Sequence, residues 1–165
     1  MFETFDDLEI DAGDTTIFVR RAGSGPPLLL LPGFPETHLM WRDVAPLLAR
    51  QFSVVCADLR GYGRSGCPPS DEDHGPYAKR AMARDMAVVM EQLGHTRFAV
   101  AGHDRLILWS ESDSLGTWYS AAGRPLALWR EWADDVRGRG VTAGHFFPEE
   151  LPVETATELS TFFRD

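Results

Sequence analysis

Short, mostly apolar runs recur along the first part of the chain. They occupy residues 28–31, 52–57 and 97–101. Continuous apolar runs of this length are typical of strands that a parallel sheet buries on both faces. The pattern therefore predicts three central strands of one sheet.

Helical periodicity separates these runs. The clearest helix is predicted over 77–93, where apolar residues recur every three or four positions and Gly94 follows the last of them. A weaker helical pattern covers 41–50 and contains Pro46, a residue that disrupts helices. Strands and helices that alternate in this way are typical of right-handed βαβ units and of a doubly wound sheet.

Different elements flank this alternating part. Residues 5–10 and 16–19 predict two strands, and the Gly and Asp residues of 11–14 predict a tight turn that joins them as an antiparallel hairpin. After residue 105 the alternation stops, because 106–109 predicts a strand directly after a strand, without the crossover that parallel neighbours require. Helical patterns resume at 126–136 and 154–163.

Composition and charge narrow the class of protein. The 165 residues are 44% hydrophobic and 25% charged, which fits one globular domain over 1–165. A net charge of −9 argues against a nucleic-acid partner, because phosphate binding relies on clustered Lys and Arg. The longest apolar stretch, 26–32, is too short to span a bilayer, and the N-terminus lacks the basic start of a signal peptide. We therefore expect a cytoplasmic protein without a membrane partner.

The two cysteines do not predict a metal site or a disulfide framework. Cys56 stands in a predicted strand and Cys67 in a predicted loop, with neither CxxC spacing nor a secretion signal. We expect both to be ordinary thiols.

A carboxylate stands where many hydrolases hold their nucleophile. Gly102, His103, Asp104 and Arg105 follow the apolar run 97–101. Small residues around an acid at the end of a strand predict a nucleophile elbow, the sharp turn that exposes one side chain above a parallel sheet. The alternative for Asp104 is a capping acid at a strand-to-helix turn.

Five sequence motifs point to the same protein family. They occupy 31–38, 58–65, 80–83, 102–105 and 144–150. Together they resemble the haloacetate (fluoroacetate) dehalogenases of the α/β-hydrolase superfamily. The resemblance covers 1–105 and 106–165, but the family's segment between these blocks is absent, namely the helix after the elbow, the next core strand and the helical cap. It implies a truncated α/β-hydrolase domain, with a mostly parallel sheet flanked by helices and no cap domain.

The resemblance also implies catalytic roles. The family's Asp nucleophile displaces halide from the α-carbon of a haloacetate, and Asp104 matches it; a carboxylate suits this attack because it is already ionised. His145 matches the base that activates water against the resulting ester, and a surface histidine before the final helix is the alternative. We expect solvated side chains at the histidines in loops or at helix ends, which are His38, His74 and His95.

The sequence leaves more than one candidate for the acid that orients His145. Dehalogenases of this type draw it from the absent segment, whereas many other α/β-hydrolases take it from the loop after the penultimate strand, where this chain has Asp113. Asp113 is one candidate, a solvated loop aspartate is an equal alternative, and Glu111 is a weaker substitute.

Two further residues match substrate-binding positions. Arg105 matches the family's clamp for the substrate carboxylate, which a guanidinium can hold through two hydrogen bonds. The backbone N–H groups of Phe34 and Arg105 would form the oxyanion hole. Leu106 departs from the family, since this position of the elbow favours glycine. The turn at 58–63 is expected to be structural.

Three functional hypotheses result. The first is hydrolysis of a 2-haloacetate to glycolate and halide through an aspartyl ester, without metal or organic cofactor. The second is a catalytically inactive α/β-hydrolase module, whose uncovered apolar surface predicts a partner such as a second copy in a homodimer. Epoxide hydrolysis ranks lower, because epoxide hydrolases usually have Trp after the Asp nucleophile, where this chain has Arg105, and two tyrosines in the cap.

Overall fold

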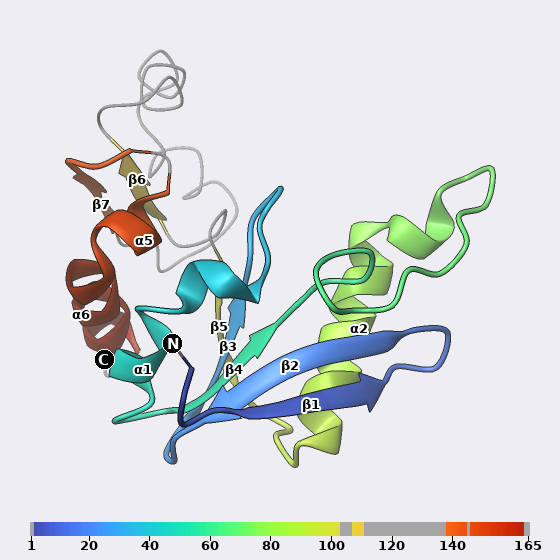
Figure 1. The fold of residues 1–165 in the computed structure, drawn as a ribbon, viewed down its shortest axis with the longest axis horizontal. Coiled ribbons are helices and arrows are strands. Elements are labelled where there is room, and N and C mark those ends of the chain that lie inside the picture. Colours follow the sequence, from blue (N-terminus) through green and yellow to red (C-terminus); the bar gives the residue numbers. More distant parts are fainter. Residues whose placement is uncertain (1, 103–106, 111–137, 145, 164–165) are drawn as a thin grey trace.

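A computed structural model describes residues 2–102, 107–110, 138–144 and 146–163 (Figure 1). Four of the predicted site residues lie outside these ranges, namely Asp104, Arg105, Asp113 and His145. The predicted helix over 126–136 also lies outside them.

A five-stranded mixed sheet forms the centre of the molecule. Its strands are β1 (Asp6–Asp11), β2 (Thr16–Ala22), β3 (Pro27–Leu31), β4 (Ser53–Ala57) and β5 (Ala99–Gly102). The order across the sheet is β1-β2-β4-β3-β5, and the β4, β3 and β5 strands are parallel. β1 and β2 form the predicted antiparallel hairpin, and β2 continues antiparallel to β4. The predicted fold class is therefore confirmed.

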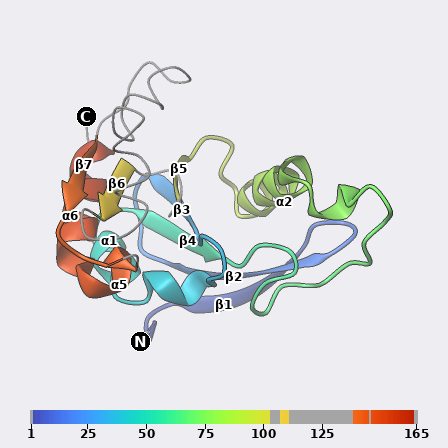
Figure 2. The ribbon, with the colours of Figure 1, turned by 90° about the horizontal axis from the view of Figure 1, so that it is seen from above.

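Helices cover both faces of this sheet (Figure 2). The helical elements are η1 (His38–Trp41), α1 (Ala45–Leu48), η2 (Gly75–Tyr77), α2 (Lys79–Gln92), α5 (Phe147–Glu150) and α6 (Pro152–Phe162). Leu28 and Leu30 pack with α1 and α6 on one face, whereas Leu29 packs with α2 on the other. Successive side chains of a strand alternate between faces, so the apolar run 28–31 is buried on both sides, as its pattern predicts.

The predicted helix over 41–50 is wrong in extent. Its residues instead form the end of η1 and the short helix α1, with Pro46 in the first turn of α1. Proline lacks an N–H and clashes with the carbonyl one turn earlier, so it fits the start of a helix and not its interior. The helix predicted over 77–93 is confirmed as α2, and Gly94 follows it with a φ of 85°.

The chain after β5 forms a separate two-stranded sheet. β6 (Ile107–Ser110) pairs in parallel with β7 (Gly138–Val141). The predicted strand at 106–109 is thus confirmed, whereas the sequence pattern did not indicate β7, because two of its four residues are glycines and form no apolar run. No helix among the described residues is long and apolar enough to cross a membrane.

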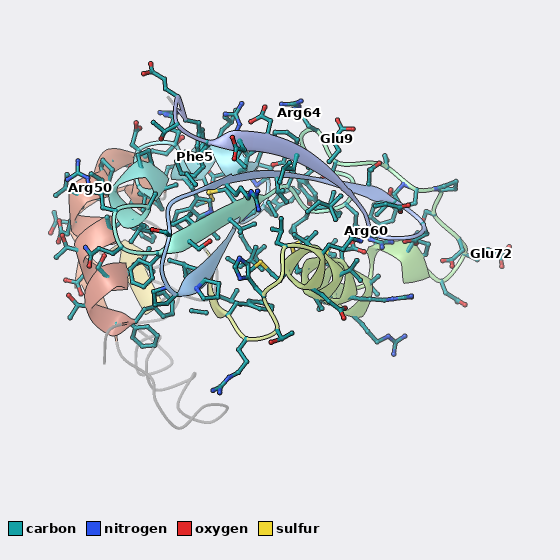
Figure 3. The ribbon with its side chains drawn as sticks, turned by 90° about the horizontal axis from the view of Figure 1, so that it is seen from below. Phe5, Glu9, Arg50, Arg60, Arg64 and Glu72 are labelled. Carbon is teal, nitrogen blue, oxygen red and sulfur yellow. The ribbon has the colours of Figure 1, made fainter. Side chains whose placement is uncertain are left out.

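A buried arginine ties α2 to the sheet. The Arg60 guanidinium donates two hydrogen bonds of 2.6 Å to the Asp85 carboxylate on α2, and both residues are nearly inaccessible to solvent. It also contacts the Asp14 carboxylate at 3.0 Å and the Pro76 carbonyl at 2.8 Å. Figure 3 shows Arg60 between α2 and the turn that joins β1 to β2. Arg60 therefore has a structural role, as expected for this turn.

Candidate functional site

Three parallel strands end at the same edge of the sheet. Because β3, β4 and β5 are parallel, their carboxyl ends lie together, and Leu31 at the end of β3 pairs with Gly102 at the end of β5. The segment 32–37 follows β3 and is called the Phe34 loop below. Residues 103–106, which include Asp104 and Arg105, follow β5. The two predicted oxyanion donors therefore belong to segments that leave neighbouring strands.

The Phe34 loop exposes the residue that the sequence assigns to the oxyanion hole. Phe34 is 76% exposed. The loop makes a turn in which the Glu36 N–H donates to the Gly33 carbonyl at 2.8 Å. The Phe34 N–H itself donates no hydrogen bond to any described residue. This amide is thus available to bind an oxygen of a substrate or intermediate.

A buried carboxylate follows β4 at the same edge. The Oδ1 atom of Asp58 accepts hydrogen bonds from the backbone N–H of His38 at 2.7 Å and from His38 Nδ1 at 2.8 Å. Its Oδ2 atom accepts the backbone N–H of Arg64 at 2.9 Å. Asp58 is fully buried. The Phe34 loop and the loop after β4 are therefore joined through one side chain.

Hydrogen bonding keeps this carboxylate ionised. Burial by itself raises the pKa of Asp58, but the hydrogen bonds from the His38 side chain and from the backbone N–H groups of Arg64 and His38 outweigh burial, and the net pKa is lowered. Asp58 therefore carries its negative charge at neutral pH.

The predicted solvated state of His38 is wrong. Its side chain is buried, and its ring packs against the rings of Phe2 and Phe18 at centroid distances of 5.8 and 5.0 Å. A loop histidine is usually solvated, whereas the carboxylate of Asp58, 20 residues away, gives the Nδ1 atom of this buried ring a hydrogen-bond partner. No local sequence signal marks this pair. His74, by contrast, is exposed as expected.

Contacts of Gly144 and of the helix α5 hold the chain on the two sides of His145. Gly144 donates its N–H to the Glu150 carboxylate at 2.7 Å. The following helix, α5, packs against η1, the element that begins where the Phe34 loop ends. Arg42 and Glu149 join the two elements through an ion pair of 3.1 Å. The helix that follows His145 is thus held against η1.

The structure tests the predicted site only in part. It places Phe34 after the carboxyl end of β3, where Leu31 pairs with Gly102 at the end of β5. The four other predicted residues lie outside the described ranges, so their side-chain geometry stays a prediction. Within the described ranges, no group of three or more His, Cys, Asp or Glu side chains could hold a metal ion.

Comparisons with known proteins give consistent relatives. A family profile of the alpha/beta hydrolase fold matches residues 26–105. Fluoroacetate dehalogenase of Burkholderia sp. is 54% identical over 105 residues, which are 64% of this chain and 34% of that protein. Soluble epoxide hydrolase of Corynebacterium sp. (strain C12) is 46% identical over 83 residues, which are 50% of this chain and 27% of that protein. The chain therefore spans about a third or less of the length of these curated relatives.

A solved structure matches almost the whole fold. A protein of Nostoc sp. PCC 7120 assigned to the alpha/beta hydrolases superposes with a TM-score of 0.84 and 26% sequence identity, and the match covers 99% of each chain. An epoxide hydrolase from an endophytic Streptomyces superposes with a TM-score of 0.57 over 61% of this chain and 30% of that one, at 33% identity.

Proposed function

We propose that this chain, which has the α/β-hydrolase fold and is related to fluoroacetate dehalogenase and to epoxide hydrolases, hydrolyses a 2-haloacetate to glycolate and halide. The observation that carries the proposal is the 54% identity to fluoroacetate dehalogenase over 105 residues. The arrangement of the carboxyl edge supports it, since the segments of both oxyanion donors leave neighbouring strands there.

The first step forms an ester. One carboxylate oxygen of Asp104 attacks the α-carbon of the haloacetate, a carbon–oxygen bond forms, and the carbon–halogen bond breaks with its electron pair leaving on the halide. Arg105 would hold the substrate carboxylate through two hydrogen bonds and so orient the α-carbon towards Asp104.

The second step cleaves the ester. His145 takes a proton from water, whose oxygen attacks the carbonyl carbon of the Asp104 ester. The oxyanion that forms accepts hydrogen bonds from the N–H groups of Phe34 and Arg105. The tetrahedral intermediate then collapses: the leaving glycolate oxygen takes the proton from His145, and the Asp104 carboxyl loses the remaining water proton to solvent and is a carboxylate again. Asp113 is our candidate for the acid that orients His145.

The test of the proposal is halide release from chloroacetate, scaled to the number of chains. Cys67 is exposed and can be alkylated by haloacetates, whereas Cys56 is buried and burial raises the pKa of its thiol. Cys67→Ser therefore serves as the background for every assay. We expect sustained turnover of chloroacetate and none of uncharged chloroacetamide. Absence of halide release from the folded chain would overturn the proposal.

Removal of the base gives a distinct expected result. In His145→Ala the first step proceeds and the ester persists, so we expect one burst of about one halide per chain and a chain heavier by one carboxymethyl group. Mass spectrometry of peptides locates the added group on Asp104. Sustained turnover by this variant, at the rate of the parent, would contradict the role of His145.

The relatives also support a second candidate function. Several of them are epoxide hydrolases, and the Corynebacterium enzyme is 46% identical over 83 residues. An Asp nucleophile and a His base would serve this reaction equally, so diol formation from styrene oxide is measured in parallel with halide release. Faster epoxide than haloacetate turnover would favour this candidate.

An inactive module is the remaining candidate. Among the described residues β5 pairs only with β3, so its other edge has no neighbour there, and Val100 on β5 is 42% exposed. Open strand edges favour pairing with another chain. Sedimentation of the purified chain distinguishes a homodimer from a monomer, and a dimer without halide release or diol formation would support this candidate.

A further inference from the structure

The carboxylate after β4 takes no part in the proposed chemistry but holds the loop that does. We propose that Asp58 and His38 are positioning residues, which fix the Phe34 loop so that the Phe34 N–H points at the oxyanion. This inference rests on the proposed role of the Phe34 amide in ester hydrolysis.

The Phe34 loop is anchored at its two ends. At its start, Leu31 belongs to the β3 ladder and pairs with Gly102. At its end, His38 gives Asp58 Oδ1 two hydrogen bonds of 2.7 and 2.8 Å. Between these anchors, the Glu36 N–H donates to the Gly33 carbonyl and closes a turn. The second anchor therefore limits how far the Phe34 amide can shift.

The Asp58 carboxylate binds two loops and makes no contact that the sheet requires. Its backbone N–H already donates to the Phe18 carbonyl at 3.0 Å, so the sheet does not need its carboxylate. Both carboxylate oxygens instead accept N–H groups of the two loops. Gly63 lies directly over this carboxylate with a φ of 53°, and any side chain there would collide with it. The loop after β4 thus closes over Asp58 and keeps it from water.

The surroundings of His38 make its hydrogen bond to Asp58 strong. The aromatic rings of Phe2 and Phe18 flank the imidazole, and both rings are buried. A hydrogen bond to a charged acceptor in such apolar surroundings is stronger than one in water, because no solvent competes for it. The His38 side chain therefore supports the backbone hydrogen bond that ends the Phe34 loop.

The position of this loop affects one chemical step. An oxyanion donor helps only when it is already aimed at the developing charge, and a shift of about 1 Å can cost about 10²-fold in rate. The oxyanion arises in ester hydrolysis and not in halide displacement. Loosening of the Phe34 loop should therefore slow the second step alone.

The experiment compares two substitutions of His38 with a matched control, all in Cys67→Ser. His38→Phe keeps an aromatic ring between Phe2 and Phe18 but removes the donor, whereas His38→Asn keeps an N–H where Nδ1 lies. Asp14→Asn is the control, since Asp14 belongs to the ion pair with Arg60, away from the Phe34 loop. Thermal unfolding of each variant shows that it is folded.

We expect His38→Phe to lower kcat for chloroacetate by about 10- to 100-fold and to leave kcat/KM nearly unchanged, with a halide burst of about one per chain. His38→Asn should retain most of the kcat, and Asp14→Asn should behave like the parent. A merely structural role would lower kcat and kcat/KM together and give no burst.

If His38→Phe does not fold, Asp58→Asn replaces it. An amide cannot accept hydrogen bonds from both loops at once, so we expect the same change in kcat.

Hydrogen exchange of backbone amides tests the positioning without any activity. We expect the amides of the Phe34 loop to exchange faster in His38→Phe than in the parent, while those of β4 are unchanged. Equal exchange of the Phe34 loop in both proteins would overturn this inference even if the parent releases halide. A parent that releases no halide would overturn the proposed function and leave the exchange result to decide the positioning.

Discussion

Replacing Asp104 by asparagine should abolish the release of halide from chloroacetate, with a loss on the order of 10⁴-fold or more. The amide of asparagine is neutral and a far weaker nucleophile than a carboxylate, so no ester forms at the α-carbon. Halide release is measured in the Cys67→Ser background, because the exposed thiol of Cys67 would otherwise contribute halide of its own.

The matched control for this substitution is Asp73→Asn. Asp73 is an exposed residue of the loop after β4, and its loss removes the same charge from the surface. We expect the control to turn over chloroacetate like the parent. Undiminished halide release by Asp104→Asn would show that another group attacks the substrate.

Replacing Asp85 by alanine should lower the free energy of unfolding by about 3–5 kcal/mol. The substitution removes both 2.6 Å hydrogen bonds and leaves the buried Arg60 guanidinium with the exposed Asp14 carboxylate and the Pro76 carbonyl, and loss of the buried partner of a buried charge is strongly destabilising. Urea denaturation followed by circular dichroism measures the change.

Two controls separate the charge from the packing. Asp14→Ala removes the exposed partner of Arg60. The Asp14 side chain is 61% accessible, so we expect the free energy of unfolding to fall by at most about 1 kcal/mol. Simultaneous replacement of Arg60 and Asp85 by methionine removes both charges, so we expect a smaller loss than for Asp85→Ala alone. An effect of Asp85→Ala no larger than that of Asp14→Ala would contradict this account of the pair.

Periodicity predicts the sheet and its main helix because burial decides both. The run 28–31 is apolar throughout, and its alternate side chains face α1 and α2 on opposite faces of the sheet. β7 could not be predicted in this way. Its sequence contains two glycines, and it is a strand because it pairs with β6, a contact between residues 31 positions apart.

The candidate site is predictable to a different degree at each residue. The sequence marks Phe34 through its motif; the structure shows this residue exposed after β3, and its role as an oxyanion donor stays a prediction. The sequence does not mark the contact between Asp58 and His38, because this buried hydrogen bond depends on two loops that meet only in the folded sheet. The roles of Asp104 and His145 stay predictions from their motifs.

The proposed mechanism depends on Asp104 as a covalent nucleophile, and one isotope measurement tests this most directly. The Cys67→Ser chain, in excess over chloroacetate, completes a single turnover in ¹⁸O-labelled water. Water attacks the ester carbonyl in the proposed mechanism, so we predict ¹⁸O in the peptide that contains Asp104 and unlabelled glycolate. Labelled glycolate with an unlabelled Asp104 peptide would show that water attacks the substrate directly, and would contradict the account.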